Sequence, residues 1–154
     1  MDSEPLVSVV IPAYNAAGTL RRALDSILNG TYRNLDIVVV DDGSTDATHR
    51  VVSDCADDRL RILRQEHAGV AAAMNRGVQA ARSDLIARMD ADDFSHPDRL
   101  RLQVIHLLDE QLDIVGGRVR IIDAAGKSVD SMQRYEAWVN SCQTHEEIMA
   151  YRFI

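Results

Sequence analysis

The chain has 154 residues, of which 46% are hydrophobic and 27% charged, enough for one domain with a substantial core. Its net charge of −7, with no basic stripe, argues against nucleic acid as the main partner. Two cysteines are too few for a metal knuckle or a disulfide framework, and no apolar run approaches the roughly 20 residues that cross a bilayer. We therefore expect a cytoplasmic protein without a membrane segment, which reaches the inner face of a membrane only through parts outside this chain.

The first half of the chain alternates predicted strands with predicted helices. A β-branched run over residues 6–11, ended by Pro12, predicts the first strand. Asn15 is predicted to cap a helix that Asn29 and Gly30 close. Residues 35–40 are apolar at successive positions, as in a parallel strand covered on both faces. The turn at 41–46 leads to a helix over about 46–57, then a short strand at 60–64 and an alanine-rich helix at 69–81.

The second half continues the pattern with a strand at 84–87 and a helix at 97–111, in which Pro97 is the expected first residue. A fifth strand with a glycine kink is predicted at 113–122, followed by a hairpin turn at 123–126 into another strand. Residues 144–147 match a capping box that opens a last helix. Four strand–helix repeats predict the α/β class, with a mostly parallel sheet and helices on both faces.

Ligands of such sheets bind beyond the carboxyl ends of the strands. This rule selects three loops that should line one crevice: residues 13–15, 41–44 and 90–93. In the last loop, Asp90 and Asp92 should project to the same side of an extended segment, with Asp93 turned away or around the bend. Two such charges about 4 Å apart repel by about 4 kcal/mol at an effective dielectric of 20. Oxygen ligands at this spacing suit Mg²⁺ or Mn²⁺ with a phosphate partner, although aspartates also serve as plain helix caps before a proline.

The other two loops carry an aromatic ring and a second acidic pair. Tyr14 can stack a nucleobase, or it can pack over the first helix. Of Asp41 and Asp42, one can accept a hydrogen bond from a base or a sugar while the other caps the second helix, or both can be caps. A stacking ring, an acceptor carboxylate and a metal-binding cluster together indicate a nucleoside diphosphate lying across the end of the sheet.

These segments resemble a known family. The resemblance rests on residues 7–15 and 40–46, on Gly69 with Ala72, Asn75 and Gly77, on 90–93, and on 97–100 with Gln103. In this order and spacing they resemble the start of the inverting, nucleotide-sugar-dependent glycosyltransferases of family two, which have the GT-A fold. The resemblance covers most of residues 6–104 and implies a nucleotide-sugar-binding GT-A domain over residues 1–154, incomplete on its carboxyl side, with the acceptor-binding part absent.

The resemblance also implies roles. Pro12, Tyr14 and Asp42 would hold the base, commonly uracil, Asp90 would contact the ribose or sugar, and Asp92 would ligate the Mn²⁺ or Mg²⁺ that bridges the phosphates of a UDP-sugar. The sugar would pass to an acceptor hydroxyl on a sugar, lipid-linked or protein acceptor. The family's catalytic base lies on a loop beyond Ile154, so no catalytic residue is assigned in this chain. The alternative is a catalytically silent nucleotide-sugar-binding or interaction domain.

The flanking cations and histidines have simpler interpretations. Arg88 and Arg99 are expected to organise the acidic loop through salt bridges rather than to contact substrate. His96, next to the acidic loop, could approach a diphosphate but is expected to be structural at a helix entry.

Overall fold

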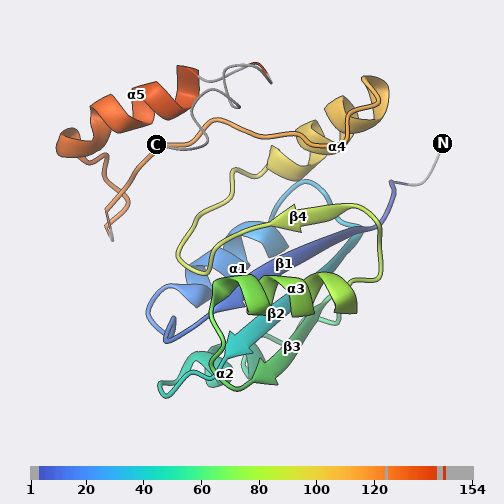
Figure 1. Cartoon of the computed structure of the whole chain (residues 1–154), viewed down its shortest axis with the longest axis vertical. Helices are drawn as coiled ribbons and strands as arrows, with labels where there is room; N and C mark the ends of the chain where they lie inside the picture. Colours follow the sequence, from blue (N-terminus) through green and yellow to red (C-terminus); the bar gives the residue numbers. More distant parts are fainter. Residues whose placement is uncertain (1–3, 124, 142–143, 145–154) are drawn as a thin grey trace.

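A computed structural model describes residues 4–123, 125–141 and 144. The strands are β1 (Val7–Ala13), β2 (Leu35–Asp42), β3 (Leu60–Gln65) and β4 (Ile86–Arg88). The helices are α1 (Leu20–Leu28), α2 (Thr48–Ser53), α3 (Val70–Ala80), α4 (Arg99–Asp109), the 3₁₀ turn η1 (Asp130–Met132) and α5 (Gln133–Ser141). Strands and helices alternate through α4 (Figure 1), which confirms the predicted α/β class. None of the described helices is long and apolar enough to cross a bilayer.

The four strands form one parallel sheet in the order β3-β2-β1-β4. The chain therefore adds strands on one side of β1 and then crosses to its other side for β4. All four carboxyl ends meet at one edge, which lies at the left of the sheet in Figure 1. The reversal of strand order between β1 and β4 is the place where ligands of open α/β sheets bind.

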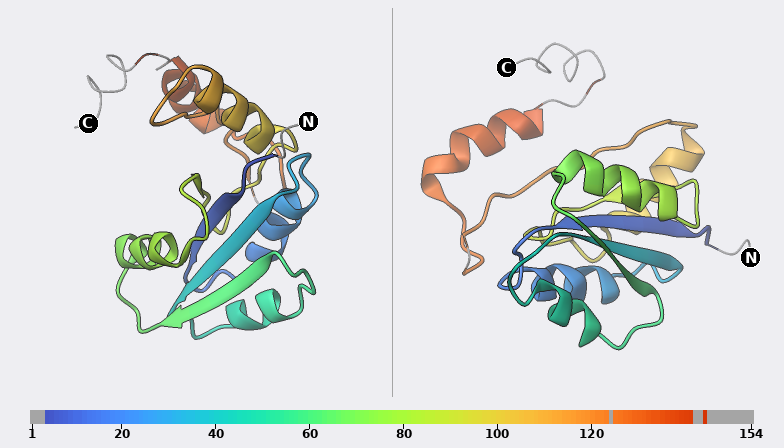
Figure 2. Two further views of the ribbon diagram at one scale, coloured as in Figure 1. Left: turned by 90° about the vertical axis from the view of Figure 1, so that its right-hand side faces the viewer. Right: turned by 60° about the horizontal axis from the view of Figure 1, so that its bottom comes forward.

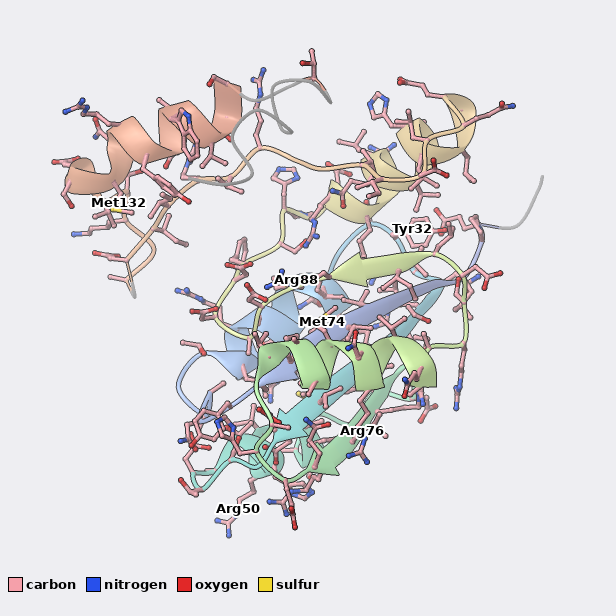
Figure 3. The ribbon with its side chains drawn as sticks, viewed as in Figure 1. Tyr32, Arg50, Met74, Arg76, Arg88 and Met132 are labelled. Atoms are coloured by element: carbon pink, nitrogen blue, oxygen red, sulfur yellow. The ribbon has the colours of Figure 1, made fainter. Side chains whose placement is uncertain are left out.

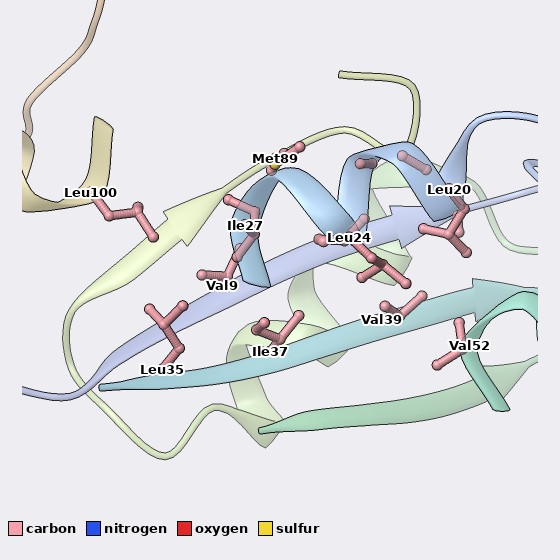
Figure 4. Close-up of a cluster of buried hydrophobic side chains, with 14 of the residues drawn as sticks. Val9, Leu20, Leu24, Ile27, Leu35, Ile37, Val39, Val52, Met89 and Leu100 are labelled. Carbon is pink, nitrogen blue, oxygen red and sulfur yellow. The ribbon is translucent and has the colours of Figure 1, made fainter. Parts of the chain in front are cut away.

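The main core fills one face of the sheet. The predicted stripe of α1 is buried against the side chains of β1 and β2 that point to this face, and Val52 of α2 joins them (Figure 4). The packed residues include Val9, Ile11, Leu20, Leu24, Ile27, Ile37 and Val39. A second view shows α1 and α2 on this face and α3 on the opposite one (Figure 2). The sheet is thus covered on both sides, as the successive apolar residues of β2 predict.

The α3 side has a thinner core, made of Val38, Val40 and Ala73. Here Gly77 lets the helix approach the sheet closely. A Cβ atom at Gly77 would lie 2.3 Å from Cγ1 of Val10 and 3.2 Å from Cγ2 of Val40. Any larger residue must therefore push α3 away from the strands.

A buried polar cluster at the amino ends of the strands anchors the end of α3. Arg61 donates to both oxygens of Asp36 at 2.8 and 2.9 Å and to the Ala80 carbonyl at 2.8 Å. Ser8 Oγ and the Arg82 amide also donate to Asp36. Burial alone raises the pKa of the Asp36 carboxyl, but the hydrogen bonds from Arg61, Ser8 and Arg82 outweigh it and lower that pKa.

Several predictions about local structure are wrong. Asn15 does not cap α1, which begins at Leu20 after Thr19; Asn15 has a φ of 50° and bridges two loops instead. Helix α4 begins two residues after Pro97. The fifth strand over 113–122 does not form: among the described residues only one antiparallel bridge, between Ile122 and Ser128, follows β4, so this segment has no strand to pair with.

A turn that includes Gly126, with a φ of 80°, lies next to that single bridge, as predicted. The strand expected after this turn does not form among the described residues. Helices η1 and α5 were not predicted, and no residue of either is buried. Helix α5 lies apart from the sheet (Figure 1). Of the predicted capping box, only Thr144 lies within the described residues.

Candidate functional site

Hydrogen bonds join the loop after β1, at residues 15–16, to the loop after β2, at residues 44–48, so that the two loops form one rim at the edge of the sheet. The Asn15 amide donates to Ser44 Oγ at 3.0 Å, and the Thr45 amide donates back to Asn15 Oδ1 at 2.9 Å. The Ala16 amide donates to Thr48 Oγ1 at 2.8 Å. The left-handed backbone of Asn15 permits these contacts, and asparagine tolerates this conformation better than most residues. Tyr14 leaves this rim toward solvent, with 49% of its surface exposed.

Asp41 and Asp42 have separate structural tasks. The fully buried Asp41 accepts from the Ser44 amide at 2.9 Å and from Arg64 Nε at 3.1 Å, so it shapes the turn. The Thr48 amide at the start of α2 is bonded by Asp46 at 2.9 Å, and not by either member of the acidic pair. Asp42 is therefore the member of the pair that is not used to form the turn or the helix.

The Asp42 carboxylate faces the loop between β3 and α3. Its Oδ1 accepts from Gln65 Nε2 at 2.6 Å and from the Ala68 amide at 2.9 Å, and its Oδ2 accepts from the Gly69 amide at 2.8 Å. His67 Nδ1 lies 3.0 Å from Oδ2. Burial raises the pKa of Asp42, but the bonds from Ala68, Gln65 and Gly69 and the nearby His67 more than reverse this, so the pKa is lowered and the group stays ionised.

His67 links Asp42 to Tyr14. The imidazole and phenol rings are stacked, with centroids 4.2 Å apart and planes at 29°. Tyr14, Asp42 and His67 thus form one contact cluster from three successive strand ends. Sequence reasoning chose only three loops and missed Gln65 and His67. The signal was available, because β3 is a parallel strand whose carboxyl end must share the same edge, with Gln65 in register with Asp42.

Pro12 marks the point where the sheet opens. Ser8 donates its amide to Leu85, and the Val10 carbonyl accepts from Met89, so every second residue of β1 turns its backbone groups toward β4. Pro12 is the next in this series and has no N–H to donate, and the paired residues of β1 and β4 end at Val10 and Arg88. Pro12 itself is buried within β1, level with Val40.

The acidic loop follows Arg88, which Figure 3 shows near the tip of β4. Met89 and Ala91 are buried in the main core, whereas Asp90 is half-buried and Asp92 is exposed. The two aspartates therefore lie on the side away from the core, as the alternation predicts. The Asp93 amide donates to the Asp90 carbonyl at 3.2 Å, which closes a turn and carries Asp93 around the bend, also as predicted.

Two arginines hold this loop. Among the described residues the expected salt bridge forms for Arg88, whereas Arg99 donates hydrogen bonds to uncharged acceptors. Arg88 pairs with Asp90 at 3.0 Å. Arg99, at the start of α4, donates to the Arg88 carbonyl at 2.9 Å and to Gln103 Oε1 at 3.1 Å. Burial lowers the pKa of Arg99, and the nearby Asp93 acts in the opposite direction. Desolvation and then repulsion from Asp90 and Asp92 raise the pKa of Asp93, so the loop carries more negative charge than its protein partners neutralise.

His96 has a structural role in this geometry. Its Nδ1 accepts from the Asp98 amide at 3.2 Å, and its carbonyl accepts from the Arg99 amide at 3.0 Å, so it shapes the entry to α4.

The acidic loop offers a partial set of metal ligands. No group of three or more His, Cys, Asp or Glu side chains converges within the described part of the chain. Asp92 is exposed and, among the described residues, has no hydrogen-bond or ion-pair partner. Magnesium commonly takes only one or two protein carboxylates together with substrate phosphates and water. The residues present therefore fit a divalent cation whose other ligands come from a bound phosphate.

The two parts of the site lie on either side of β1. The cluster of Tyr14, Asp42 and His67 belongs to the β1–β2–β3 side, and the acidic loop follows β4. Strands β2 and β4 are separated only by β1, so their axes are roughly 10 Å apart, twice the spacing of neighbouring strands. No direct contact joins Asp92 to the Tyr14 cluster among the described residues. One edge of the sheet therefore carries an aromatic ring and a hydrogen-bond acceptor on one side of β1, and a negatively charged loop on the other side.

Comparison with known proteins defines the family. The sequence profile of glycosyl transferase family 2 matches residues 8–152, almost the whole chain. The chain belongs to glycosyl transferase family 2. One relative, an uncharacterized glycosyltransferase of Rickettsia felis, is 36% identical over 129 residues, which cover 81% of this chain and 21% of the relative. The chain spans 21%, 38% and 51% of the lengths of three such relatives, so it corresponds to a part of them.

Solved structures agree on the fold. TarS residues 1–349 of S. aureus in complex with UDP-GlcNAc superimposes with a TM-score of 0.64 at 24% identity, covering 68% of this chain and 32% of TarS 1–349. The mannosyltransferase PcManGT of Pyrobaculum calidifontis, in complex with GDP-Man and Mn²⁺, gives a TM-score of 0.63 at 29% identity, covering 77% of this chain and 35% of that protein. The likeness confirms the predicted GT-A fold.

Proposed function

We propose that this chain is the donor-binding part of a glycosyltransferase, which transfers a sugar from a UDP-sugar to an acceptor hydroxyl with inversion at the anomeric carbon. The observation that carries the proposal is the pairing of two sites at one sheet edge. An exposed ring beside a buried, ionised carboxylate lies on one side of β1. On the other side lies an exposed carboxylate that has no hydrogen-bond or ion-pair partner within the described part of the chain.

The base would lie at the end of β1 and β2. The exposed ring of Tyr14 provides a stacking surface worth about 1–3 kcal/mol for a base. Asp42 stays ionised, so it accepts hydrogen bonds and selects a ring that presents an N–H, such as uracil. Buried Pro12 would lie beneath the base, at the point where β4 has diverged from β1.

The diphosphate would lie toward the acidic loop, with Asp92 holding a Mn²⁺ or Mg²⁺ ion and Asp90 facing the ribose or sugar. When bound there, a divalent ion would supply electrostatic stabilisation of negative charge on the diphosphate leaving group. The protein's own contribution is positioning. The bonds from Arg99 to the Arg88 carbonyl and from the Ser95 amide to buried Ser26 Oγ fix the loop against α4 and α1.

Binding of UDP in the presence and absence of Mn²⁺, measured by titration calorimetry, tests the proposal. We expect UDP to bind only when the metal is present, and UDP at a hundredfold excess over its Kd to raise the free energy of unfolding by about 2.7 kcal/mol. GDP and dTDP should bind more weakly than UDP. Asp92→Asn should abolish the metal dependence, whereas Asp109→Asn, on the exposed end of α4, should leave it unchanged. Equal metal-dependent titrations for wild type and Asp92→Asn would rule out this metal position.

Turnover separates an enzyme from a binding domain. Release of sugar from UDP-sugars by this chain, compared with a version extended past Ile154, tests whether a base beyond that residue is needed. Equal activity in both would place the base within the chain.

A further inference from the structure

We propose that the imidazole of His67 occupies the position that the nucleotide base must take, so that His67 is an internal competitor that lowers the affinity of the donor site. The inference rests on the proposed function, because it assigns the base to Tyr14 and Asp42. The observations that support it are different from those that support the proposed function: they are the contacts that His67 makes with both of these side chains.

The Asp42 carboxylate has little capacity for a further donor. An ionised carboxylate offers about four lone-pair positions. Three are taken by hydrogen bonds from Gln65, Ala68 and Gly69. His67 Nδ1 is hydrogen-bonded to the Asp42 carbonyl oxygen at 3.1 Å, and it also lies 3.0 Å from Oδ2, so that it covers the remaining position. A base N–H can therefore reach Asp42 only where one of these four groups withdraws.

His67 is the group that can withdraw. The donors of Ala68 and Gly69 are backbone amides at the entry to α3, and Gln65 belongs to β3. The side chain of His67 is 55% exposed, which leaves it room to rotate. Its backbone, by contrast, is fixed: a Cβ atom at Gly43 would lie only 2.7 Å from the His67 nitrogen. The ring can swing out while the loop stays in place.

The Tyr14 contact points to the same conclusion. The two ring centroids are 4.2 Å apart at an angle of 29°, which is a stacked geometry. The His67 ring thus has a nitrogen 3.0 Å from the Asp42 carboxylate and a face on Tyr14, which are the two positions proposed for the base. Binding then exchanges one ring for another, and the apparent Kd is the intrinsic value divided by the fraction of molecules with His67 displaced.

The test compares His67→Ala with wild type in UDP titrations at saturating Mn²⁺. A stacked pair of this kind is worth enough to close the site in most molecules, so we expect His67→Ala to bind UDP roughly three- to tenfold more tightly. His49→Ala is the matched control, because His49 is exposed on α2 and lies outside this cluster; its UDP affinity should equal that of wild type. Weaker binding to His67→Ala would overturn the inference and make His67 a support for the base.

A measurement on the unaltered protein adds an independent check. In the NMR spectrum, addition of UDP should move the His67 ring-proton resonance away from the position imposed by the Tyr14 ring current. An unmoved resonance at saturating UDP would contradict displacement. Failure of wild type and both variants to bind UDP would instead overturn the donor site itself, and the inference with it.

Discussion

Replacement of Gly77 by alanine tests whether α3 packs closely against the sheet. The new Cβ atom would lie 2.3 Å from Val10 Cγ1, well inside van der Waals contact. Overpacking of this kind costs about 1–3 kcal/mol. The 2.3 Å separation places the cost in the upper part of this range, at about 2–3 kcal/mol. Alanine regains about 1 kcal/mol of helix propensity over glycine, so we expect a net loss of about 1–2 kcal/mol in the free energy of unfolding. Urea denaturation monitored by circular dichroism measures it.

A double-mutant cycle with Val10→Ala isolates the contact. Val10→Ala alone should destabilise the protein by about 2 kcal/mol, because it leaves a cavity. Adding Gly77→Ala to it should cost less than in wild type, with a coupling of at least about 1 kcal/mol. Gly18→Ala is the control, since nothing lies within 4 Å of its added Cβ atom. A Gly77→Ala protein as stable as wild type, or purely additive effects, would refute the close packing.

Two further predictions concern charged groups. The pKa of Asp36 is lower in the folded chain than in the unfolded chain. Its contribution to the free energy of unfolding is therefore complete above the pKa of the unfolded chain, and it is lost as the pH falls through the pKa of the folded chain. The difference in unfolding free energy between wild type and Asp36→Asn should therefore be constant above about pH 5 and shrink as the pH falls below about 4, in urea titrations. A difference that stays constant on acidification would contradict the lowered pKa. Arg99→Gln should reduce stability by about 1.5 kcal/mol and weaken metal-dependent UDP binding, because the Arg88 carbonyl loses a charged donor. Arg101→Gln is the control, because the partner of Arg101 is Asp98 on the surface; it should change neither the stability nor the UDP binding measured by calorimetry. Equal effects of the two substitutions would argue against a role for Arg99 in holding the loop.

The sheet was predictable because the residues of each strand form a pattern that is visible in the local sequence. The runs over 6–11 and 35–40 are apolar at all but one position each, and the stripe on α1 has a clear helical period. The predicted strand at 113–122 also contains β-branched residues, although Gly116 and Gly117 interrupt it, and a strand needs a neighbour as well as a propensity. Asn15 was misassigned for a related reason: its side chain bonds Thr45, 30 residues away, and a local pattern does not reveal that contact.

The site was predictable in outline and not in detail. The rule that parallel strands present their carboxyl ends together brought the loops of Tyr14, Asp42 and Asp92 to one edge. It could not show that Asp42 already holds donors from Gln65, Ala68 and Gly69, because those bonds depend on the register of β3 against β2. Nor could it show the stack of His67 on Tyr14. Which hydrogen-bond positions of a side chain are already occupied depends on packing, whereas the placement of the loops follows from topology alone.

The central claim is that one nucleotide spans the edge from Tyr14 to Asp92. Its most direct test is the ¹H–¹⁵N spectrum of the chain titrated with UDP, first with Mg²⁺ and then with paramagnetic Mn²⁺. We predict that UDP with Mg²⁺ shifts the amides of Tyr14, Asp42 and His67, and that Mn²⁺ broadens signals centred on Asp92 only when UDP is bound. Shifts at a different surface, or broadening centred elsewhere in the presence of UDP, would contradict a shared donor site at this edge.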